Sequence, residues 1–156
     1  PYDLYVVNSV QEEIGLFGSK MITETIKPDV AICFDVCFDT NAPLIDKGKH
    51  GDYKLNEGLV FRFGKDVHLN LFRLMKKVAN ETEMPFKVDI GGSGGTNTYS
   101  YYLSNGGVVT STISIPLRHM HTPNEVVGLE DVQRVIDYYV DLLKNINYKH
   151  DFKLVK

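Results

Sequence analysis

The chain has 156 residues, of which 43% are hydrophobic and 24% are charged, and its formal net charge at pH 7 is −3. This length and composition are those of one globular unit with a sizeable core, and no apolar run approaches the roughly 18 residues of a membrane span, so we expect no membrane partner. The slightly acidic balance offers no basic surface for phosphates, so we also expect no nucleic-acid partner.

The first predicted element is a buried strand over residues 4–10, a short apolar run rich in β-branched side chains. It begins almost directly after Pro1, without a methionine or a leader. We therefore expect the chain to be a piece of a longer protein, in which case the lack of a signal peptide says nothing about its compartment.

Two adjacent carboxylates, Glu12 and Glu13, follow this run and precede a turn marked by Gly15. On a regular strand they would face opposite ways, because side chains alternate with a period of two. At a strand end both can reach one cleft, and open α/β sheets form clefts at strand ends. One carboxylate could then bind a metal ion while its neighbour moves a proton. The alternative is a solvated surface turn.

A helix is expected over residues 19–27, ending before Pro28, and residues 30–38 carry the strongest strand pattern in the chain. This strand is apolar throughout apart from Asp35, as expected for a strand that is covered on both faces. An isolated ionised carboxylate is costly there unless it is paired or bound to a cation. Asp35 is therefore either one half of an ion pair with Arg or Lys, or a metal ligand near a strand end.

Cys33 and Cys37 share a face with Asp35 if the strand is regular. A Cys-Asp-Cys metal site is conceivable, but the favoured interpretation is two buried core thiols. Two cysteines in the whole chain are too few for a disulfide framework, so we expect a reducing, cytoplasmic compartment.

The next stretch, residues 40–63, is rich in Gly, Asn, Asp and Lys and predicts a long connection with at most a short hairpin. Asp66 is a candidate N-cap for a helix that runs to about Asn80. The apolar residues of that helix fall at helical spacing, and they are Leu71, Leu74, Met75 and Val78.

Residues 86–90 predict a short strand, and residues 96–104 predict a helix or turn. Between them lies a glycine loop, residues 91–95, which lacks the Lys-Ser/Thr of a phosphate-binding P-loop. Its expected role is to let the backbone approach a cleft closely. Residues 108–115 alternate as a strand does, and residues 116–127 predict an irregular loop.

This loop contains His119 and His121, separated by one residue. Neutral imidazole is the commonest nitrogen ligand of zinc, although a single histidine is more often a structural group. The pattern alone leaves both interpretations open.

The final helix is predicted with Glu130 and Asp131 in its first turn, where the helix dipole favours acids. Its apolar face is expected to contain Val132, Ile136, Tyr139, Leu143 and Ile146. Strands alternate with helices along the chain, and no repeat or linker interrupts it. The sequence therefore predicts an α/β fold in which residues 1–156 form a single unit.

The order of these motifs resembles one family, the co-catalytic dinuclear metallo-aminopeptidases of the glutamyl-aminopeptidase and tetrahedral-aminopeptidase type, some of which are labelled cellulase M or endoglucanase. The likeness runs over nearly the whole chain. It rests on the segments VQEEIGLFG (10–18), FDV (34–36), GTNT (95–98), IPLRHMHTP (115–123) and VVGLEDV (126–132).

This resemblance implies a three-layer αβα sandwich around a phosphorylase/hydrolase-like mixed sheet. It also implies a hydrolase that removes N-terminal residues from peptides with two divalent metal ions, zinc or cobalt, in a homo-oligomer of two to twelve subunits. Glu12 would be the general base, Glu13 and His121 ligands of one metal, and Asp35 a ligand of the other. His119 stands where the family often has tyrosine, and the two cysteines match no ligand.

The resemblance covers only the C-terminal portion of the family's catalytic domain. The HxD-type motif, a bridging aspartate and a small inserted domain are missing, so the isolated chain is expected to be inactive. Asn97 replaces an aspartate that is common in the family, which keeps open an alternative, a degenerate non-catalytic subunit for assembly or peptide binding. Glycoside hydrolysis needs two carboxylates that flank a sugar, which adjacent glutamates do not supply.

Overall fold

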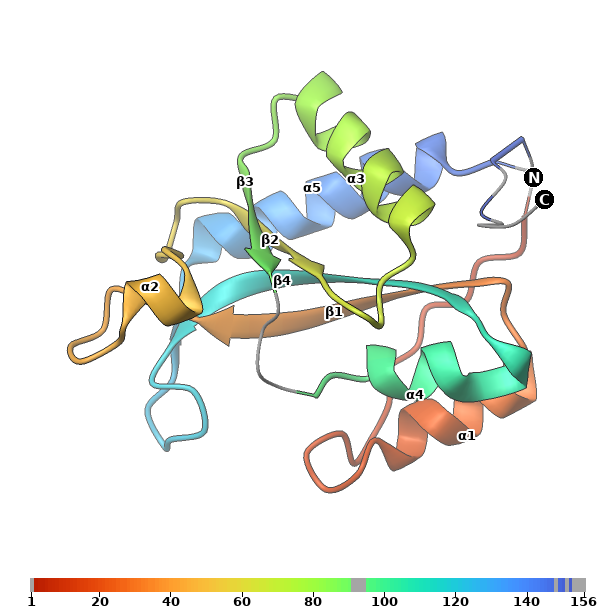
Figure 1. Ribbon diagram of the computed structural model, residues 1–156, viewed down its shortest axis with the longest axis horizontal. Coiled ribbons are helices and arrows are strands. Elements are labelled where there is room, and N and C mark those ends of the chain that lie inside the picture. Colours follow the sequence, from red (N-terminus) through yellow and green to blue (C-terminus); the bar gives the residue numbers. More distant parts are fainter. Residues whose placement is uncertain (1, 91–94, 148, 151, 153–156) are drawn as a thin grey trace.

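The computed structural model describes residues 2–90, 95–147, 149, 150 and 152, and its centre is a mixed β-sheet (Figure 1). The strands lie in the order β1-β4-β2-β3, and the short β5 pairs with β4. β1 is parallel to β4, β2 is antiparallel to β4, and β3 is parallel to β2. The bounds are β1 Val30–Phe38, β2 Leu59–Phe63, β3 Phe86–Ile90, β4 Val109–Arg118 and β5 Val126–Val127.

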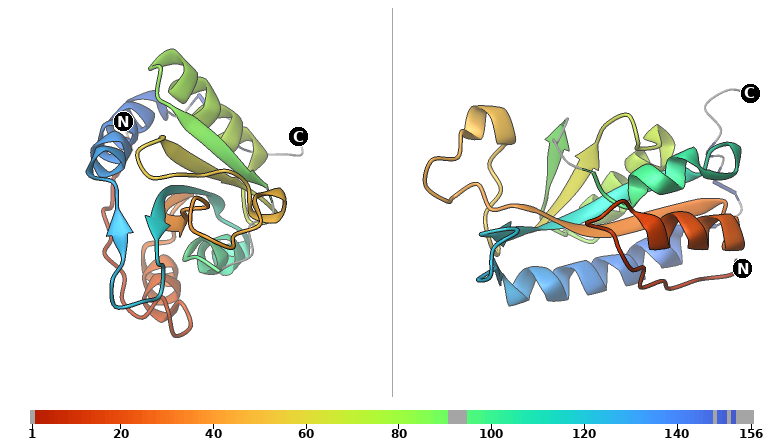
Figure 2. Two further views of the ribbon diagram at one scale, coloured as in Figure 1. Left: turned by 90° about the vertical axis from the view of Figure 1, so that its left-hand side faces the viewer. Right: turned by 90° about the horizontal axis from the view of Figure 1, so that it is seen from below.

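Helices cover both faces of this sheet (Figures 1 and 2), which confirms the predicted α/β fold with a mixed sheet between helical layers. α3 (Leu69–Glu81) and α5 (Leu129–Asn145) lie on one face. α4 (Thr98–Leu103) lies on the other, with α1 (Phe17–Ile26) packed against it. A one-turn helix, α2 (Lys47–His50), and a 3₁₀ turn, η1 (Ser104–Gly106), complete the described elements.

The apolar core lies between the sheet and the layer of α3 and α5. Its fully buried side chains include Phe61 of β2 and Ile113 of β4. The predicted apolar stripe of α3 is confirmed, because Leu71, Leu74, Met75 and Val78 are all buried.

The opposite face of β4 is polar. Thr112 is buried there and its hydroxyl forms a hydrogen bond with the hydroxyl of Thr98 on α4. One layer further out, Ser19 of α1 is bonded to Ser100 of α4, with 2.7 Å between their Oγ atoms. Hydroxyl pairs thus join the second helical layer to the sheet, whereas apolar burial joins the first.

The prediction of a buried strand over residues 4–10 is wrong. Residues 2–9 adopt no regular secondary structure and form no backbone–backbone hydrogen bonds with the described part of the chain. Most of their side chains are exposed, and Val6 reaches 91%. Strand propensity reflects packing on a sheet, and no strand described here lies against this segment (its red trace is visible in Figure 2).

The predicted connection over residues 40–63 is wrong in its last part, because β2 lies within it. The predicted loop over residues 116–127 is also too long. β4 continues through Pro116, which is paired with Cys37, and β5 closes the segment against Leu117 and Arg118. The turn-forming residues within 40–63 and Pro116 misled these two predictions, because pairing with neighbouring strands outweighs such local signals.

Two predictions about burial and capping also need correction. Asp66 does not cap α3, which begins at Leu69 after His68; instead its buried carboxylate lies 3.6 Å from Arg62 Nε. β1 is not fully covered on both faces, because Phe34 and Phe38, which share one face, remain 49% and 43% exposed.

The predicted face of α5 is rotated relative to the observed one. Val135, Tyr138 and Leu142 are buried in the core, Val132, Tyr139 and Ile146 pack at its margin, and Ile136 is 52% exposed. The apolar positions of this helix span more than half its circumference, so spacing alone does not identify the inner face.

This orientation of α5 can be tested by paired truncations. Leu142→Ala should lower the free energy of unfolding by about 2–5 kcal/mol, because it opens a cavity in the core. Ile136→Ala should change it by no more than about 0.5 kcal/mol, as at other surface positions. Urea unfolding measures both, and equal losses would contradict the observed orientation.

Candidate active site

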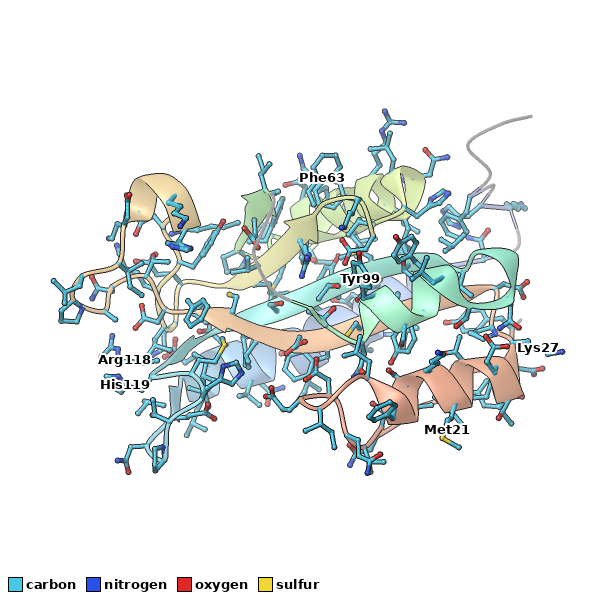
Figure 3. All side chains as sticks on the ribbon, turned by 60° about the horizontal axis from the view of Figure 1, so that its bottom comes forward. Met21, Lys27, Phe63, Tyr99, Arg118 and His119 are labelled. Atoms are coloured by element: carbon cyan, nitrogen blue, oxygen red, sulfur yellow. The ribbon has the colours of Figure 1, made fainter. Side chains whose placement is uncertain are left out.

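A cleft of about 610 Å³ opens where β1 and β4 end, beside the turn that carries the two glutamates. Its wall includes all four side chains that the sequence singled out, Glu12, Glu13, Asp35 and His121. Figure 3 shows the side chains of this region, with Arg118 and His119 labelled on the segment that leads out of β4. The fold thus gathers residues from three distant parts of the chain.

The glutamate turn is held by its own backbone. The Leu16 N–H donates to the Glu12 carbonyl at 3.0 Å, and the Gly18 N–H donates to the Val10 carbonyl at 3.0 Å. A Cβ at Gly18 would lie only 2.4 Å from the Val10 oxygen, so this approach requires glycine. The turn brings Glu12 and Glu13 to the same cleft although they are neighbours in sequence.

Glu13 and His121 contact each other across the cleft, with 3.3 Å between Oε1 and Nε2. The loop of His121 is tightly folded, because His119 and His121 both adopt left-handed backbone conformations, at φ 60° and 63°. The backbone N–H of His121 also donates to Glu125 Oε1 at 2.6 Å. These contacts present the imidazole to Glu13 from the opposite wall.

Asp35 is the more buried acid of the site. Burial raises the pKa of the Asp35 carboxyl, and the negative charge of Glu13 raises it further. The Val36 N–H, which donates to Oδ1 at 2.8 Å, lowers this pKa, as do the charges of Arg62 and His121. Within the described residues Asp35 makes no ion pair with Lys or Arg, and Arg62 acts on it through its charge alone.

Glu12 lies close enough to the other acids to respond to them. Partial burial raises the pKa of its carboxyl, and the charges of Asp35 and Glu13 raise it further, whereas His121 lowers it. A carboxylate with a raised pKa is a stronger base, which is the property that proton transfer requires.

Two other candidates, His119 and Cys33, do not line the cleft. His119 is exposed. Burial raises the pKa of the Cys33 thiol to about 11 and that of the Cys37 thiol further still. Cys33 is buried, as the core interpretation expects, whereas Cys37 is partly buried and lines the cleft. Residues 91–94 of the glycine loop lie outside the described residues, while Gly95 and Thr96 line the cleft.

The donor types suit a divalent metal, because carboxylate and imidazole bind zinc and cobalt alike. In the described part of the chain, however, no group of three or more His, Cys, Asp or Glu side chains is arranged to hold one ion. Glu13 and His121 offer two donors at one point, and Asp35 offers another elsewhere in the cleft. The residues fit part of a metal centre.

Sequence reasoning missed the far side of the cleft, which Tyr53, Arg62 and Asp89 line. Burial raises the pKa of the Asp89 carboxyl, and the Tyr53 hydroxyl donates to its Oδ1 at 3.4 Å. Arg62 and Asp89 occupy paired positions on β2 and β3. The one signal in the sequence for this side of the cleft was Asp89, an acid within the predicted strand 86–90.

Comparison with known proteins adds a family match. Residues 1–138 match the family model described as M42 glutamyl aminopeptidase. The chain is 34% identical over 145 residues to the lysyl aminopeptidase of Pyrococcus furiosus, covering 92% of this chain and 41% of that protein. The chain therefore spans about two fifths of the length of this curated relative.

Solved structures of aminopeptidases share the fold. An aminopeptidase of Desulfurococcus kamchatkensis superposes with a TM-score of 0.81 at 30% identity, over 88% of this chain and 40% of that one. The TET1 peptidase of Pyrococcus horikoshii gives 0.65 at 26% identity, over 86% and 38%, and is described as assembling into a tetrahedron or a large octahedral shell.

Asp35 should leave a signature in the pH dependence of stability. Because folding raises the pKa of Asp35, the folded state favours the protonated acid. Its contribution to the free energy of unfolding is fully present below the unfolded pKa, near 3.8, and is lost as pH rises through the folded pKa. Asp35→Asn should therefore make the free energy of unfolding fall less steeply between about pH 4 and 7. An unchanged slope in Asp35→Asn would contradict the burial of this carboxyl in the folded state.

Proposed function

This chain belongs to the M42 glutamyl aminopeptidase family, and on that premise we propose that it carries part of the catalytic centre of a metal-dependent aminopeptidase. The observation that supports the proposal is the meeting of Glu12, Glu13, Asp35 and His121 in one cleft, with Glu13 and His121 3.3 Å apart. Burial raises the pKa values of Asp35 and Glu12 there, and acids with perturbed pKa values in a cleft are typical of functional sites.

In this proposal Glu13 and His121 would hold one divalent ion, zinc or cobalt, and Asp35 would contribute to a second. Such ions supply Lewis-acid activation of the scissile carbonyl and of the attacking water. The Val36 N–H steadies the Asp35 carboxylate, and Glu125 steadies the backbone of His121, so both donors are oriented by the chain itself.

Glu12 is proposed as the general base. It would take the proton from the water whose oxygen attacks the carbonyl carbon, and would pass that proton to the amine nitrogen as the C–N bond breaks. The products are a free amino acid and a peptide shortened by one residue. The raised pKa of Glu12 supports this role, because the carboxylate then accepts a proton more readily.

The proposal treats this chain as an incomplete centre. It spans 41% of the Pyrococcus furiosus lysyl aminopeptidase, and its described donors do not form a complete site. We therefore propose that the 156-residue chain alone binds metal weakly and does not hydrolyse peptides. In the complete enzyme we propose peptide substrates and a homo-oligomeric assembly between dimer and dodecamer, and a similar solved structure, PhTET1-12s, which is described as a dodecamer, supports the upper end of this range. Two free thiols suit a reducing, cytoplasmic location.

A second candidate is a non-catalytic subunit, and Asn97 is the observation that favours it. Asn97 Nδ2 donates to Ser9 Oγ at 3.1 Å, while its buried Oδ1 has no hydrogen-bond partner in the described structure. The side chain is thus turned to the N-terminal segment, where an amide can donate and a carboxylate cannot.

Zinc titration of the chain by calorimetry tests the metal assignment. Weak binding is expected, and His121→Ala should weaken it by about tenfold or more, because an imidazole donor is lost. Glu12→Gln should leave zinc affinity unchanged, since a general base is no ligand. Loss of binding in Glu12→Gln, or two tight sites in the unaltered chain, would contradict this division of roles.

Activity is tested in a chimera in which this chain replaces the matching segment of the Pyrococcus furiosus lysyl aminopeptidase. The chimera should hydrolyse aminoacyl anilides, and Glu12→Gln should lower the rate by at least about 100-fold with metal content unchanged. Asn97→Asp serves as the companion variant. Activity that appears only with Asn97→Asp would favour the non-catalytic subunit.

A further inference from the structure

A buried ion pair joins the ends of β1 and β4, just after Asp35 on one strand and just before His121 on the loop that follows the other. Arg118 Nε and Nη2 lie 2.7 and 2.6 Å from Asp39 Oδ2. The Asp39 side chain is fully buried, whereas Arg118 is 36% exposed. Short contacts from two guanidinium nitrogens to one carboxylate are strong, charge-assisted hydrogen bonds.

The remaining bonds of Asp39 extend the sheet by one residue. Its Oδ1 accepts the Asn41 N–H at 2.9 Å, and its own N–H donates to the Leu117 carbonyl at 2.9 Å. Asp39 therefore faces β4 with both backbone and side chain.

Arg118 in turn stands at the base of the loop that carries His121. It is the last residue of β4 and is paired with Val126 of β5, so residues 119–125 leave and return at this point. Within the loop the Glu125 carboxylate accepts the His121 N–H. The Asp39–Arg118 pair thus fastens the base of the loop to β1, the strand of Asp35.

We propose that Asp39 and Arg118 are positioning residues that set His121 opposite Glu13 and at a fixed offset from Asp35. The proposal rests on the function proposed above and adds residues that touch neither metal nor substrate. Without the pair, no side-chain contact described here fastens Arg118 to the β1 end, and only backbone pairing with β1 up to Leu117 and with β5 supports the loop base, so the position of the imidazole relative to the acids becomes less fixed. Supporting partners of this kind typically change metal affinity by about 10–100-fold when they are removed.

Asp39→Asn is the suitable variant. It keeps the size of the side chain and an acceptor for the Asn41 N–H, and it leaves Arg118 able to reach water. Arg118→Ala would instead strand a buried charge, which costs about 3–5 kcal/mol and risks unfolding the chain. Asp39→Glu is not a suitable companion variant. It keeps the negative charge, but its longer side chain does not fit a fully buried position.

The chain contains a matched control in Asp131 and Arg134. The Asp131 side chain is also fully buried, its Oδ1 lies 2.9 Å from Arg134 Nη1, and it accepts backbone N–H groups of Asn56 and Gly58. Neither residue lines the cleft. Asp131→Asn therefore removes the same kind of contact away from the site.

The experiment combines two readouts on the full 156-residue chain. Zinc affinity is measured by calorimetry, and nuclear Overhauser contacts between the His121 ring and the Glu13 side chain are measured by NMR without metal. Asp39→Asn should weaken zinc binding by about tenfold and abolish these contacts, whereas Asp131→Asn should preserve both.

The two readouts separate the possible failures. Intact Overhauser contacts in Asp39→Asn, or equal losses of zinc affinity in both variants, would overturn the positioning role. If the unaltered chain binds no zinc while Asp39→Asn still loses the contacts, the metal centre is refuted and the positioning role stands.

Discussion

The parallel pairing of β1 with β4 is the contact on which the rest of the structure depends. It runs without interruption from Val30 opposite Val109 to Phe38 opposite Leu117. Because the strands are parallel, both end at the same edge, so that Asp35 and the loop of His121 arrive at one cleft. β4 also pairs with β2 and β5. A slip of one residue in β1 would turn Asp35 to the other face of the sheet.

The cleft at this edge is electrostatically unfavourable for the chain alone. Burial raises the pKa values of Glu12 and Asp35, and neighbouring acids raise them further, with Asp35 and Glu13 acting on Glu12, and Glu13 acting on Asp35. Elsewhere the same fold pairs its buried acids well, as Asp39 with Arg118 and Asp131 with Arg134 show. In the part of the chain that the structure describes, the acids of the cleft lack such short contacts to a cationic side chain, and conflict between sequence and stability is expected where a site serves binding or catalysis.

Local pattern predicted those elements whose signal does not depend on their neighbours. The bounds of β1 and β3 and the buried stripe of α3 follow from apolar runs and helical spacing. A strand was predicted near the N-terminus, where residues 2–9 form none, and no strand was predicted where β2 forms. Both errors have the same cause, because a strand forms only where a neighbouring strand accepts its hydrogen bonds. For the site, residue patterns left the roles of Glu12, Asp35 and His121 open, and the family resemblance narrowed them. Neither the residue patterns nor the resemblance identified Arg62 and Asp89, because their position in the cleft depends on the strand order β1-β4-β2-β3.

The two walls of the cleft differ in how firmly they are held, and this bears on how the site would work. Asp35 and the loop of His121 belong to the sheet, which the core under α3 and α5 supports. Glu12 and Glu13 belong to a turn that precedes α1, and α1 is joined to α4 and η1 through Ser19, Ser100 and the bond from Asn105 Nδ2 to the Thr23 carbonyl. These part-buried hydroxyl and amide bonds each stabilise less than the burial of a large apolar side chain. The glutamate turn is held by its own backbone but lies outside the apolar core, so a cation shared by Glu13 and His121 would add a direct link between this wall and the wall that the sheet forms.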